Sequence, residues 1–420
     1  MKQFIQKQLA RKAKKLVDEH KPIIIGVTGS VGKTSTRNAI ATILSVKFDV
    51  AKNIKNYNNE FGLPLTILGK VSPKRSVFGW LSVLLSAPKT LPQVFVLEYG
   101  VDHPGDMKYL CDIVSPSIAV MTAISPVHAE HFATVESLLE EKAHLLSCVP
   151  DTGVCILNAD DQRVMGASQH CTAPILTYGF NSQAQIRASD YNVWTRDDYS
   201  FEPGEKFSQV TVNVHTQDET VFELSLENML GKANVSVVLA AVAVAKQLGM
   251  TNEEILEGVK QIKTEPGRMN PIPGIKGSLI IDSTYNAAPA SMAAALDVLK
   301  EFDVTEGSKK IAVLGTMAEL GKYSVDAHRQ IGMRAAEVAD WLVTVGEPML
   351  DARHGAIEAG MAEDHTEQFG DAIEAGRWLD AHVKKGDVVL IKGSRSMGME
   401  RTVKDVMAEP ARAEELLCST

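Results

Sequence analysis

The segment Gly26-Val-Thr-Gly-Ser-Val-Gly-Lys-Thr-Ser-Thr36 follows the isoleucine run 23–25 and precedes a helical pattern. A glycine-rich loop between a strand and a helix lets backbone N–H groups and the helix N-terminus surround a phosphate. Lys33 is expected to reach the outer phosphates, and the Thr34 hydroxyl to bind Mg²⁺. The strict phosphate-loop pattern has glycine at position 27, where this chain has valine, but the strand–loop–helix context favours a nucleotide site. The residues expected to hold the nucleotide there are Gly29, Ser30, Val31, Gly32, Lys33, Thr34 and Ser35.

Short apolar runs alternate with helical patterns outward from this segment. The runs 94–97, 118–121 and 154–157 join 23–25 as predicted strands. This alternation predicts βαβ units and a mainly parallel sheet in an α/β protein. Residues 185–228 instead alternate polar and apolar positions between turn residues, which predicts a small antiparallel excursion attached to the same domain.

A second α/β domain is predicted beyond the turn-rich stretch Thr264-Glu-Pro-Gly-Arg268, where a hinge is expected near Pro266. Strand-like runs resume there at 279–281, 311–314, 341–345 and 388–391. The predicted organisation is a leader helix over 1–21, a phosphate-loop central domain over 22–265 and a Rossmann-like domain over 266–420.

Composition excludes several classes of protein. The 420 residues are 45% hydrophobic and 23% charged, the balance of a soluble globular chain rather than a disordered or collagen-like one. A net charge of −9 argues against a nucleic-acid partner. Five cysteines without C-x-x-C spacing predict neither a disulfide framework nor a zinc site. Since no apolar run approaches the roughly 18 residues that span a membrane, a cytoplasmic protein is expected.

The first 21 residues differ from the rest in carrying seven basic and two acidic side chains. Ile5, Leu9, Ala13 and Leu16 recur at helical spacing among them, which predicts a basic amphipathic helix. Such a helix either lies peripherally on the inner face of the membrane or caps the next domain, and the sequence favours neither. The apolar run 77–85 is too short to cross a membrane and is predicted to be a buried helix rather than an interfacial anchor.

Two polar residues stand at positions suited to metal binding. Glu98 ends a predicted strand, from which a carboxylate can reach a metal at the carboxyl edge of a parallel sheet. His128 follows another predicted strand, and both residues are equally well explained as surface residues at strand ends. Lys142 has by itself the pattern of a solvated lysine on a helix.

Further blocks follow the phosphate loop in a fixed order. They are Asn56-Tyr-Asn-Asn-Glu-Phe-Gly-Leu-Pro64, Glu98-Tyr-Gly100, His128-Ala-Glu-His-Phe132, Leu157-Asn-Ala-Asp-Asp161, Gly267-Arg-Met269, Asp282-Ser-Thr-Tyr-Asn-Ala-Ala-Pro289, Val313-Leu-Gly-Thr-Met-Ala-Glu-Leu-Gly321 and Lys392-Gly-Ser-Arg395. With them the chain resembles the Mur ligases, ATP-dependent enzymes of cell-wall synthesis, from Ile23 onward. Within that family it is most similar to the MurF branch, which adds D-alanyl-D-alanine to a UDP-muramoyl tripeptide.

The resemblance implies a role for each matching residue. Lys33 and Thr34 would hold the ATP phosphates and Mg²⁺, with Glu98 as a further Mg²⁺ ligand. His128 would contact a second metal site, and Lys142 would be the lysine that the family carbamylates, which turns a cation into an anionic oxygen ligand. The implied catalytic set is Lys33, Lys142 and His128. Further nucleotide contacts are implied for Asn234, Arg268, Asp282 and Asn286, and substrate contacts for Asn58, Asn59, Lys392, Ser394 and Arg395.

The implied reaction forms an amide between two small molecules. ATP phosphorylates the carboxylate of the muramoyl tripeptide, and the amine of D-Ala-D-Ala displaces phosphate from the acyl phosphate. The products are the amide, ADP and phosphate. The resemblance is incomplete, because MurF enzymes usually carry a uridine-nucleotide-binding domain before the phosphate loop, whereas 25 residues precede Gly26 here, too few for a domain.

Three hypotheses therefore stay open. The acceptor is the usual nucleotide, held by the central and C-terminal domains alone. Alternatively it is lipid-linked or otherwise altered, and the segments 1–21 and 77–85 keep the enzyme at the membrane. The third hypothesis is a non-catalytic nucleotide-binding regulator. The implied phosphate and metal site is present in full, and this argues against the third hypothesis. Its residues are Lys33, Thr34, Glu98, His128 and Lys142.

Overall fold

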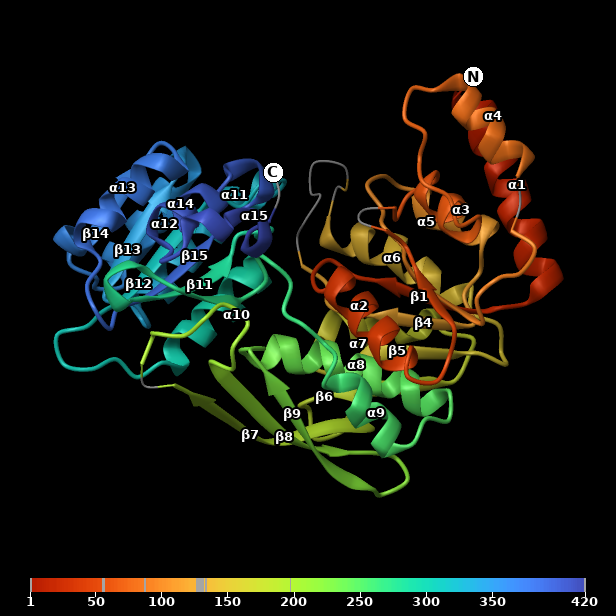
Figure 1. Cartoon of the computed structure of the whole chain (residues 1–420), viewed down its shortest axis with the longest axis horizontal. Helices are drawn as coiled ribbons and strands as arrows, with labels where there is room; N and C mark the ends of the chain where they lie inside the picture. The colour runs from red at the N-terminus through yellow and green to blue at the C-terminus, as the bar shows by residue number, and fades with distance from the viewer. Residues whose placement is uncertain are drawn as a thin grey trace.

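The computed structural model describes residues 2–54, 57–86, 88–125, 132, 134–196 and 198–418, which form two β-sheets with helices on their faces (Figure 1). This arrangement confirms the predicted α/β class. The first sheet has nine strands, in spatial order β2 (Val50–Lys52), β3 (Val94–Glu98), β1 (Ile23–Thr28), β4 (Ile118–Met121), β5 (Val154–Asn158), β6 (Ile175–Gly179), β7 (Ile186–Thr195), β8 (Ser208–His215) and β9 (Val221–Glu227).

Strands β1 to β6 run parallel and have helices on both faces, which is why their central members read as continuous apolar runs. Alternate side chains serve opposite cores: Val27 faces one helical layer and Ile24 the other. The layer on the Val27 side is α2 (Lys33–Leu44), α8 (Lys232–Gln247) and α9 (Asn252–Val259). The layer on the Ile24 side is α1 (Lys2–His20), α3 (Gly62–Ile67), α5 (Asp106–Ile113), α6 (Val135–Ser147) and α7 (Gln162–Gly166).

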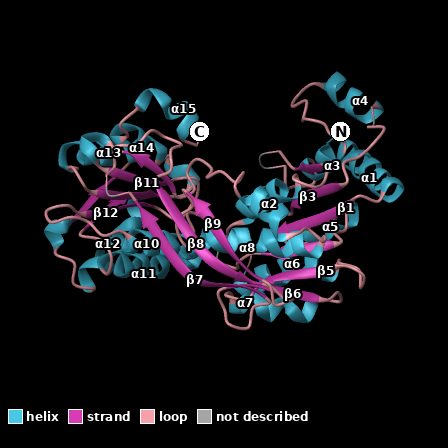
Figure 2. Cartoon of the chain, turned by 60° about the horizontal axis from the view of Figure 1, so that its bottom comes forward, coloured by secondary structure: helices cyan, strands magenta, loops and turns pink. Residues whose placement is uncertain are grey.

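The antiparallel end of the first sheet lies where the sequence predicts it. Strand β7 pairs in parallel with β6, and β8 pairs antiparallel with both β7 and β9. The connection between β7 and β8 reaches further than expected, because Phe201 and Phe207 pack with Phe302 in the core of the second sheet. Figure 2 shows these long strands extending from the first sheet towards the second. The excursion therefore joins the two sheets instead of belonging to the first alone.

The second sheet has six strands, of which only the edge strand β10 is antiparallel to its neighbour. In spatial order they are β10 (Asn270–Pro273), β11 (Leu279–Ser283), β15 (Val388–Lys392), β12 (Lys310–Gly315), β13 (Trp341–Val345) and β14 (Thr366–Phe369). One face is covered by α10 (Pro289–Glu301), α11 (Ser324–Ala336) and α12 (Leu350–Glu358), and the other by α13 (Ala372–His382), α14 (Glu400–Val406) and α15 (Ala413–Leu416).

Helix α1 packs against the first sheet's helices. Its residues Leu9, Ala13 and Leu16 are buried in the same core as α3 and α5. The apolar face of α1 is therefore covered by the protein, as in a capping helix, and would not itself enter a membrane, while most of its basic side chains are exposed.

The run 77–85 forms helix α4 (Val77–Leu85), but the prediction that this helix is buried is wrong. Only Val83 is buried, while Val77, Phe78, Leu81 and Leu85 are exposed. The sequence shows that these residues are apolar, but not which neighbours are available to cover them. Among the described residues no helix is both long and apolar enough to cross a bilayer.

Candidate functional site

The phosphate loop lies between β1 and α2, and its two glycines are required by its shape. Gly29 has a φ of 141°, and a Cβ there would lie 2.1 Å from Thr122 Oγ1. Gly32 is the N-cap of α2 with a φ of 84° and has no side chain to cap the first turn. The N–H groups of that turn are thus open to an anion, as the sequence predicts.

Side chains and backbone from the end of β4 hold this loop in place. The Ser30 N–H donates to the Ala123 carbonyl at 2.6 Å, and the Thr122 hydroxyl donates to the Val31 carbonyl at 2.7 Å. Val27, where the strict pattern has glycine, lies inside β1 in register with both neighbouring strands and is fully buried. The departure from the pattern therefore falls in the strand and leaves the loop itself unchanged.

Lys33 and Thr34 begin α2 beneath the loop. The Lys33 ammonium donates to the Ser30 carbonyl at 3.2 Å, so this side chain folds back across the loop. Desolvation lowers the pKa of Lys33, while the nearby Glu98 carboxylate opposes that shift. The Thr34 hydroxyl donates to Glu98 Oε2 at 2.8 Å. The loop, its lysine and the acid at the end of β3 thus form one cluster.

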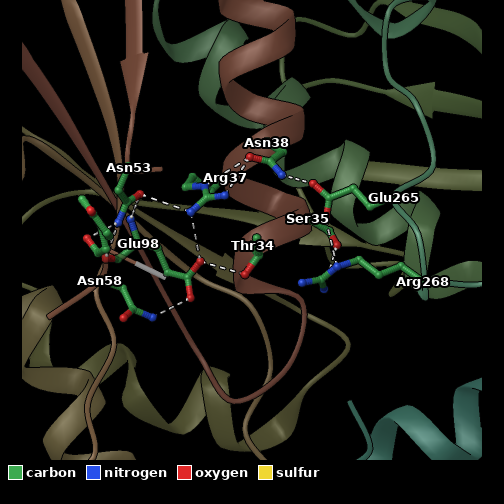
Figure 3. A network of polar contacts seen from close by, with 10 residues as sticks. Thr34, Ser35, Arg37, Asn38, Asn53, Asn58, Glu98, Glu265 and Arg268 are labelled. Carbon is green, nitrogen blue, oxygen red and sulfur yellow. Dashed lines mark hydrogen bonds and ion pairs between the residues drawn. The ribbon is translucent and has the colours of Figure 1, made fainter. Parts of the chain in front are cut away.

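Glu98 is held from several sides (Figure 3). The Asn53 amide oxygen accepts from the Glu98 N–H at 3.0 Å, and its Nδ2 donates to the Glu98 carbonyl at 3.1 Å. Asn58 Nδ2 donates to Glu98 Oε1 at 3.1 Å. Arg37 forms an ion pair with Oε2 at 3.5 Å, with both side chains at most 6% exposed. The carboxylate is therefore fixed in position.

Thr34 and Glu98 fit a Mg²⁺ ion. They are adjacent hard oxygen donors beside a phosphate loop, and Mg²⁺ in such sites takes one or two protein oxygens and completes its shell with phosphate and water. In the described ranges there is no group of three or more His, Cys, Asp and Glu suited to a metal, so these two residues would not form a closed protein cage. His128, the predicted contact of a second metal, lies outside the described residues.

Lys142 is not the solvated lysine that its local pattern suggests. It lies in α6 with 1% of its surface exposed. Burial holds the pKa of this amine well below that of a free lysine, and repulsion from Lys33 lowers it further. The negative charges of Asp102 and Glu98 act in the opposite direction, so the amine lies within electrostatic range of the phosphate-loop cluster. The fold thus brings together Lys33, Glu98 and Lys142 from three separate elements.

The segment that leads to the second sheet contacts the start of α2 directly (Figure 3). Arg268 Nη1 donates to the Ser35 hydroxyl at 3.3 Å, and Arg268 Nε pairs with Glu265 at 2.9 Å. The Asn38 amide donates to the same Glu265 carboxylate. Arg268 also stacks 4.1 Å above the ring of Tyr285. Of the residues predicted in the second domain, Arg268 is therefore the one that reaches the phosphate-loop helix.

Asp282 and Lys392 are buried within the second unit, by which we mean the second sheet and its helices, and both form hydrogen bonds to other groups there. Asp282 accepts from the Gly267 N–H at 2.9 Å and from the Thr284 hydroxyl at 2.7 Å, while burial raises its pKa to about 6. The Lys392 ammonium donates to the Asn286 carbonyl at 2.7 Å, and burial lowers its pKa to about 7. Both residues shape the loop after β11.

Two further predicted residues of the second unit lie around this loop. The Ser394 hydroxyl accepts from the Ala318 N–H at 2.8 Å. Arg395 lies 6.0 Å from the Tyr285 ring, and its buried Nη1 has no hydrogen-bond partner in the described part of the chain. The side chain of Asn286 is exposed.

Two of the asparagines predicted to contact ligands make local hydrogen bonds in the structure. Asn59 Oδ1 accepts from the N–H groups of Phe61 and Gly62 and so starts α3. Asn234 Nδ2 donates to the Leu230 carbonyl at 2.9 Å. Each amide has a structural use that the sequence did not indicate.

The sequence pattern did not point to Arg37 or Asn53. Arg37 stands among the polar residues that begin α2, and only the fold shows that it is buried and requires a partner. Asn53 gives no such signal, since its role depends on the pairing of β2 with β3.

Comparison with known proteins agrees with this geometry. A family model described as Mur ligase middle domain matches residues 27–245, and one described as Mur ligase, glutamate ligase domain matches residues 267–395. The UDP-N-acetylmuramoyl-tripeptide--D-alanyl-D-alanine ligase of Bacillus subtilis is 28% identical over 404 residues, which cover 96% of this chain and 79% of that protein. The ligase of the same name from Synechocystis is 30% identical over 389 residues, covering 92% and 75%.

Solved structures share the architecture. The crystal structure of MurF ligase from Thermotoga maritima in complex with ADP matches with a TM-score of 0.78 at 26% identity, covering 98% of this chain and 84% of that one. MurF from Acinetobacter baumannii gives the same TM-score at 25% identity, covering 94% and 79%. With the first family model matching more than half of its 420 residues, this chain belongs to the Mur ligase family.

Proposed function

We propose that this chain is an ATP-dependent amide ligase of peptidoglycan precursor synthesis, which adds D-alanyl-D-alanine to a muramoyl tripeptide. The observation that carries the proposal is the cluster of the phosphate loop, the Thr34–Glu98 pair and the buried Lys142, which Arg268 approaches from the second unit. Curated relatives named for this reaction cover nearly the whole chain, and a MurF structure contains ADP.

The chemistry requires an activated carboxylate, because a carboxylate is a poor electrophile. The terminal phosphoryl group of ATP is transferred to an oxygen of the acceptor carboxylate, and its bond to ADP breaks. The amine of D-Ala-D-Ala then attacks the acyl carbon, phosphate leaves, and the amine loses a proton. Lys33 and the N-terminus of α2 stabilise the charge on the transferring group.

Thr34 and Glu98 are the residues that would hold Mg²⁺, which supplies further neutralisation of the phosphate charge when it is bound. Arg37 and Asn58 orient the Glu98 carboxylate for this role. His128 is the proposed contact for a second Mg²⁺.

Lys142 is proposed to carry a carbamate. CO₂ reacts only with a neutral amine: the N–C bond forms, an electron pair moves to oxygen, and the nitrogen releases a proton. Burial and Lys33 lower the pKa of Lys142, which favours that neutral form. The resulting anion faces the Lys33 ammonium, where a protonated Lys142 would be repelled.

We propose three parts of the chain: a leader over 1–21, a central domain over 22–265 and a second domain over 266–420. The second domain would complete the site. Arg268 is assigned to the nucleotide, since it already lies at the first turn of α2. Arg395 is assigned to a substrate carboxylate, because its buried Nη1 lacks a partner among the described residues and a guanidinium binds carboxylates well.

Phosphate release tests the proposal. Purified protein with ATP and Mg²⁺ is expected to release phosphate only when a UDP-muramoyl tripeptide and D-Ala-D-Ala are both present, and mass spectrometry should find the joined amide. ATP binding without release on any acceptor would support the regulatory hypothesis instead. Release that requires a lipid-linked acceptor would retain the reaction but change its substrate.

A further inference from the structure

Helix α4 exposes a continuous apolar face. Val77 is 61% exposed, Phe78 86%, Leu81 53% and Leu85 78%. At 3.6 residues per turn these four positions fall within an arc of about 100°, so they form one side of the helix. The helix itself contains no charged residue. A contiguous group of large apolar side chains of this kind marks an interaction surface rather than ordinary protein surface.

The opposite side of α4 is fixed to the protein. Val83 is buried, and the Trp80 ring meets Phe61 edge to face with centroids 6.0 Å apart. The Trp80 indole N–H donates to the Lys74 carbonyl at 3.1 Å. Lys12 of α1 donates to the Leu84 carbonyl at 2.6 Å and so satisfies the C-terminal end of the helix. The apolar face is therefore presented by an anchored element that also rests on α1.

The surroundings of this face are strongly basic. Helix α1 and residues 61–97 together contain ten lysines and arginines against two acidic residues, Asp18 and Glu19, in a chain whose net charge is −9. The ten are Lys2, Lys7, Arg11, Lys12, Lys14, Lys15, Lys70, Lys74, Arg75 and Lys89. A second copy of this chain would bring like charges together here, whereas an anionic surface would neutralise them.

We propose that α4 and α1 bind the surface of a bilayer that contains anionic lipids. The exposed side of α4 enters the boundary between headgroups and acyl chains, and the basic residues of α1 and of the segment around α4 contact lipid phosphates. Nine residues rise about 13 Å as a helix, which is too short to cross the hydrocarbon core, so α4 lies in the interface.

The position of α4 leaves the candidate site open to water. In Figures 1 and 2, α4 and α1 lie at the end of the first unit remote from the second sheet, whereas the start of α2 lies between the two units. Membrane binding of this kind does not depend on which reaction the site performs. It would, however, bring any bound substrate close to the bilayer.

Vesicle flotation with the full chain tests the proposal. The protein is expected to float with vesicles of phosphatidylglycerol and phosphatidylcholine, in proportion to the phosphatidylglycerol content, and to dissociate as salt rises. Leu81→Glu and Phe78→Glu should each weaken binding at least about tenfold, because each places a charge where an apolar side chain is inserted. Val325→Glu is the matched control, since Val325 is also 54% exposed but lies on α11 of the second unit.

Charge-reversal variants test the contribution of the basic residues to membrane binding. Lys14→Glu combined with Arg75→Glu should reduce binding and its salt dependence, whereas Lys384→Glu combined with Lys385→Glu makes the same change of charge on the second unit and should leave binding intact. Trp80 supplies a measurement on the parent protein: lipids brominated in their acyl chains should quench a component of fluorescence that Trp80→Phe lacks.

Three outcomes would overturn the proposal. The first is no flotation with anionic vesicles, and the second is equal loss in Leu81→Glu and Val325→Glu. The third combines two results: the parent does not bind vesicles, and it sediments as a dimer that Phe78→Glu converts to a monomer. That outcome would assign the face to a protein partner. A failure of the ligase assay leaves all of these readouts unchanged.

Discussion

At the scale of single residues, the candidate site contains the buried charged side chains Arg37, Glu98 and Lys142 beside the partly buried Lys33. Arg37 and Glu98 neutralise each other at 3.5 Å. Lys33 and Lys142 repel each other, and burial favours the neutral form of both. An arriving polyanion such as a nucleotide triphosphate would relieve that repulsion. The arrangement of these lysines is thus suited to a negatively charged ligand.

Lys142→Ala tests the proposed carbamate. The variant is expected to lose most of its phosphate release, at least about 100-fold, because it lacks the anionic oxygens beside the metal site. A short carboxylate such as formate in the buffer should restore part of that activity by occupying the vacated volume. Lys108→Ala removes an exposed lysine of α5 and should behave as the parent does. Near-normal activity of Lys142→Ala, with no effect of formate, would contradict the proposed carbamate.

Lys392 makes stability depend on pH with a predictable sign. Its folded pKa of about 7 lies below the unfolded value of 10.5, so between these limits the unfolded chain binds more protons. The free energy of unfolding that Lys392 contributes should therefore be largest above about pH 10, fall as pH is lowered towards 7, and be lost below the folded pKa. Urea unfolding of the parent and of Lys392→Met should show a difference in stability that grows with pH, and a difference independent of pH would contradict the shift.

At the scale of elements, some features follow from the local sequence pattern, and others depend on contacts in the folded protein. The central parallel strands of both sheets and the phosphate loop were predictable, because burial on two faces demands continuous apolar runs and anion binding demands glycines at fixed positions. The parallel strands β2, β6 and β14 were not predicted. The burial of α4 was predicted wrongly, since an apolar run specifies a helix but not what covers it. Lys142 needed the family resemblance, and Asn53 needed the fold, because each acts only through neighbours distant in sequence.

The connection between β7 and β8 is expected to stabilise the second unit. Phe207 is fully buried there against Phe201 and Phe302, at centroid distances of 4.8 and 6.4 Å. Phe207→Ala should lower the free energy of unfolding by about 3–5 kcal/mol, as truncation of a buried phenylalanine does. Urea unfolding followed by circular dichroism measures the loss. Val221→Ala, at an exposed position of β9, should change stability by less than about 0.5 kcal/mol. Equal losses of stability in Phe207→Ala and Val221→Ala would show that Phe207 does not pack against the second unit.

At the scale of the whole molecule, two units share one candidate site, and few side chains cross between them at the start of α2. Glu265 is central to that crossing, because it accepts from Asn38 and pairs with Arg268, which contacts Ser35. The contacts lie in the short segment between α9 and β10. The position of the second unit is therefore coupled to the phosphate-loop helix itself.

Glu265→Ala should uncouple the units without altering the phosphate loop. We expect kcat for phosphate release to fall about tenfold, because Arg268 loses the carboxylate that holds it at Ser35. Small-angle X-ray scattering should show a broader distribution of interatomic distances than in the parent. Glu257→Ala, which removes an exposed acid of nearby α9, is the control. Unchanged kcat and scattering in Glu265→Ala would mean that the contact does not position the second unit.

The β7–β8 connection has a mechanical consequence when it is considered together with the segment at Glu265. Contacts that join the second unit to the first include Phe207 against Phe302, the Tyr191 hydroxyl that donates to Glu301, Leu230 in the core of the second sheet, and the chain that runs from α9 into β10. Because Glu301 and Phe302 follow each other at the end of α10, the first contacts meet the second unit at one place. An opening that keeps these contacts intact is then a swing about a line through the end of α10 and the Glu265 segment, and one distance between two labels is enough to follow it.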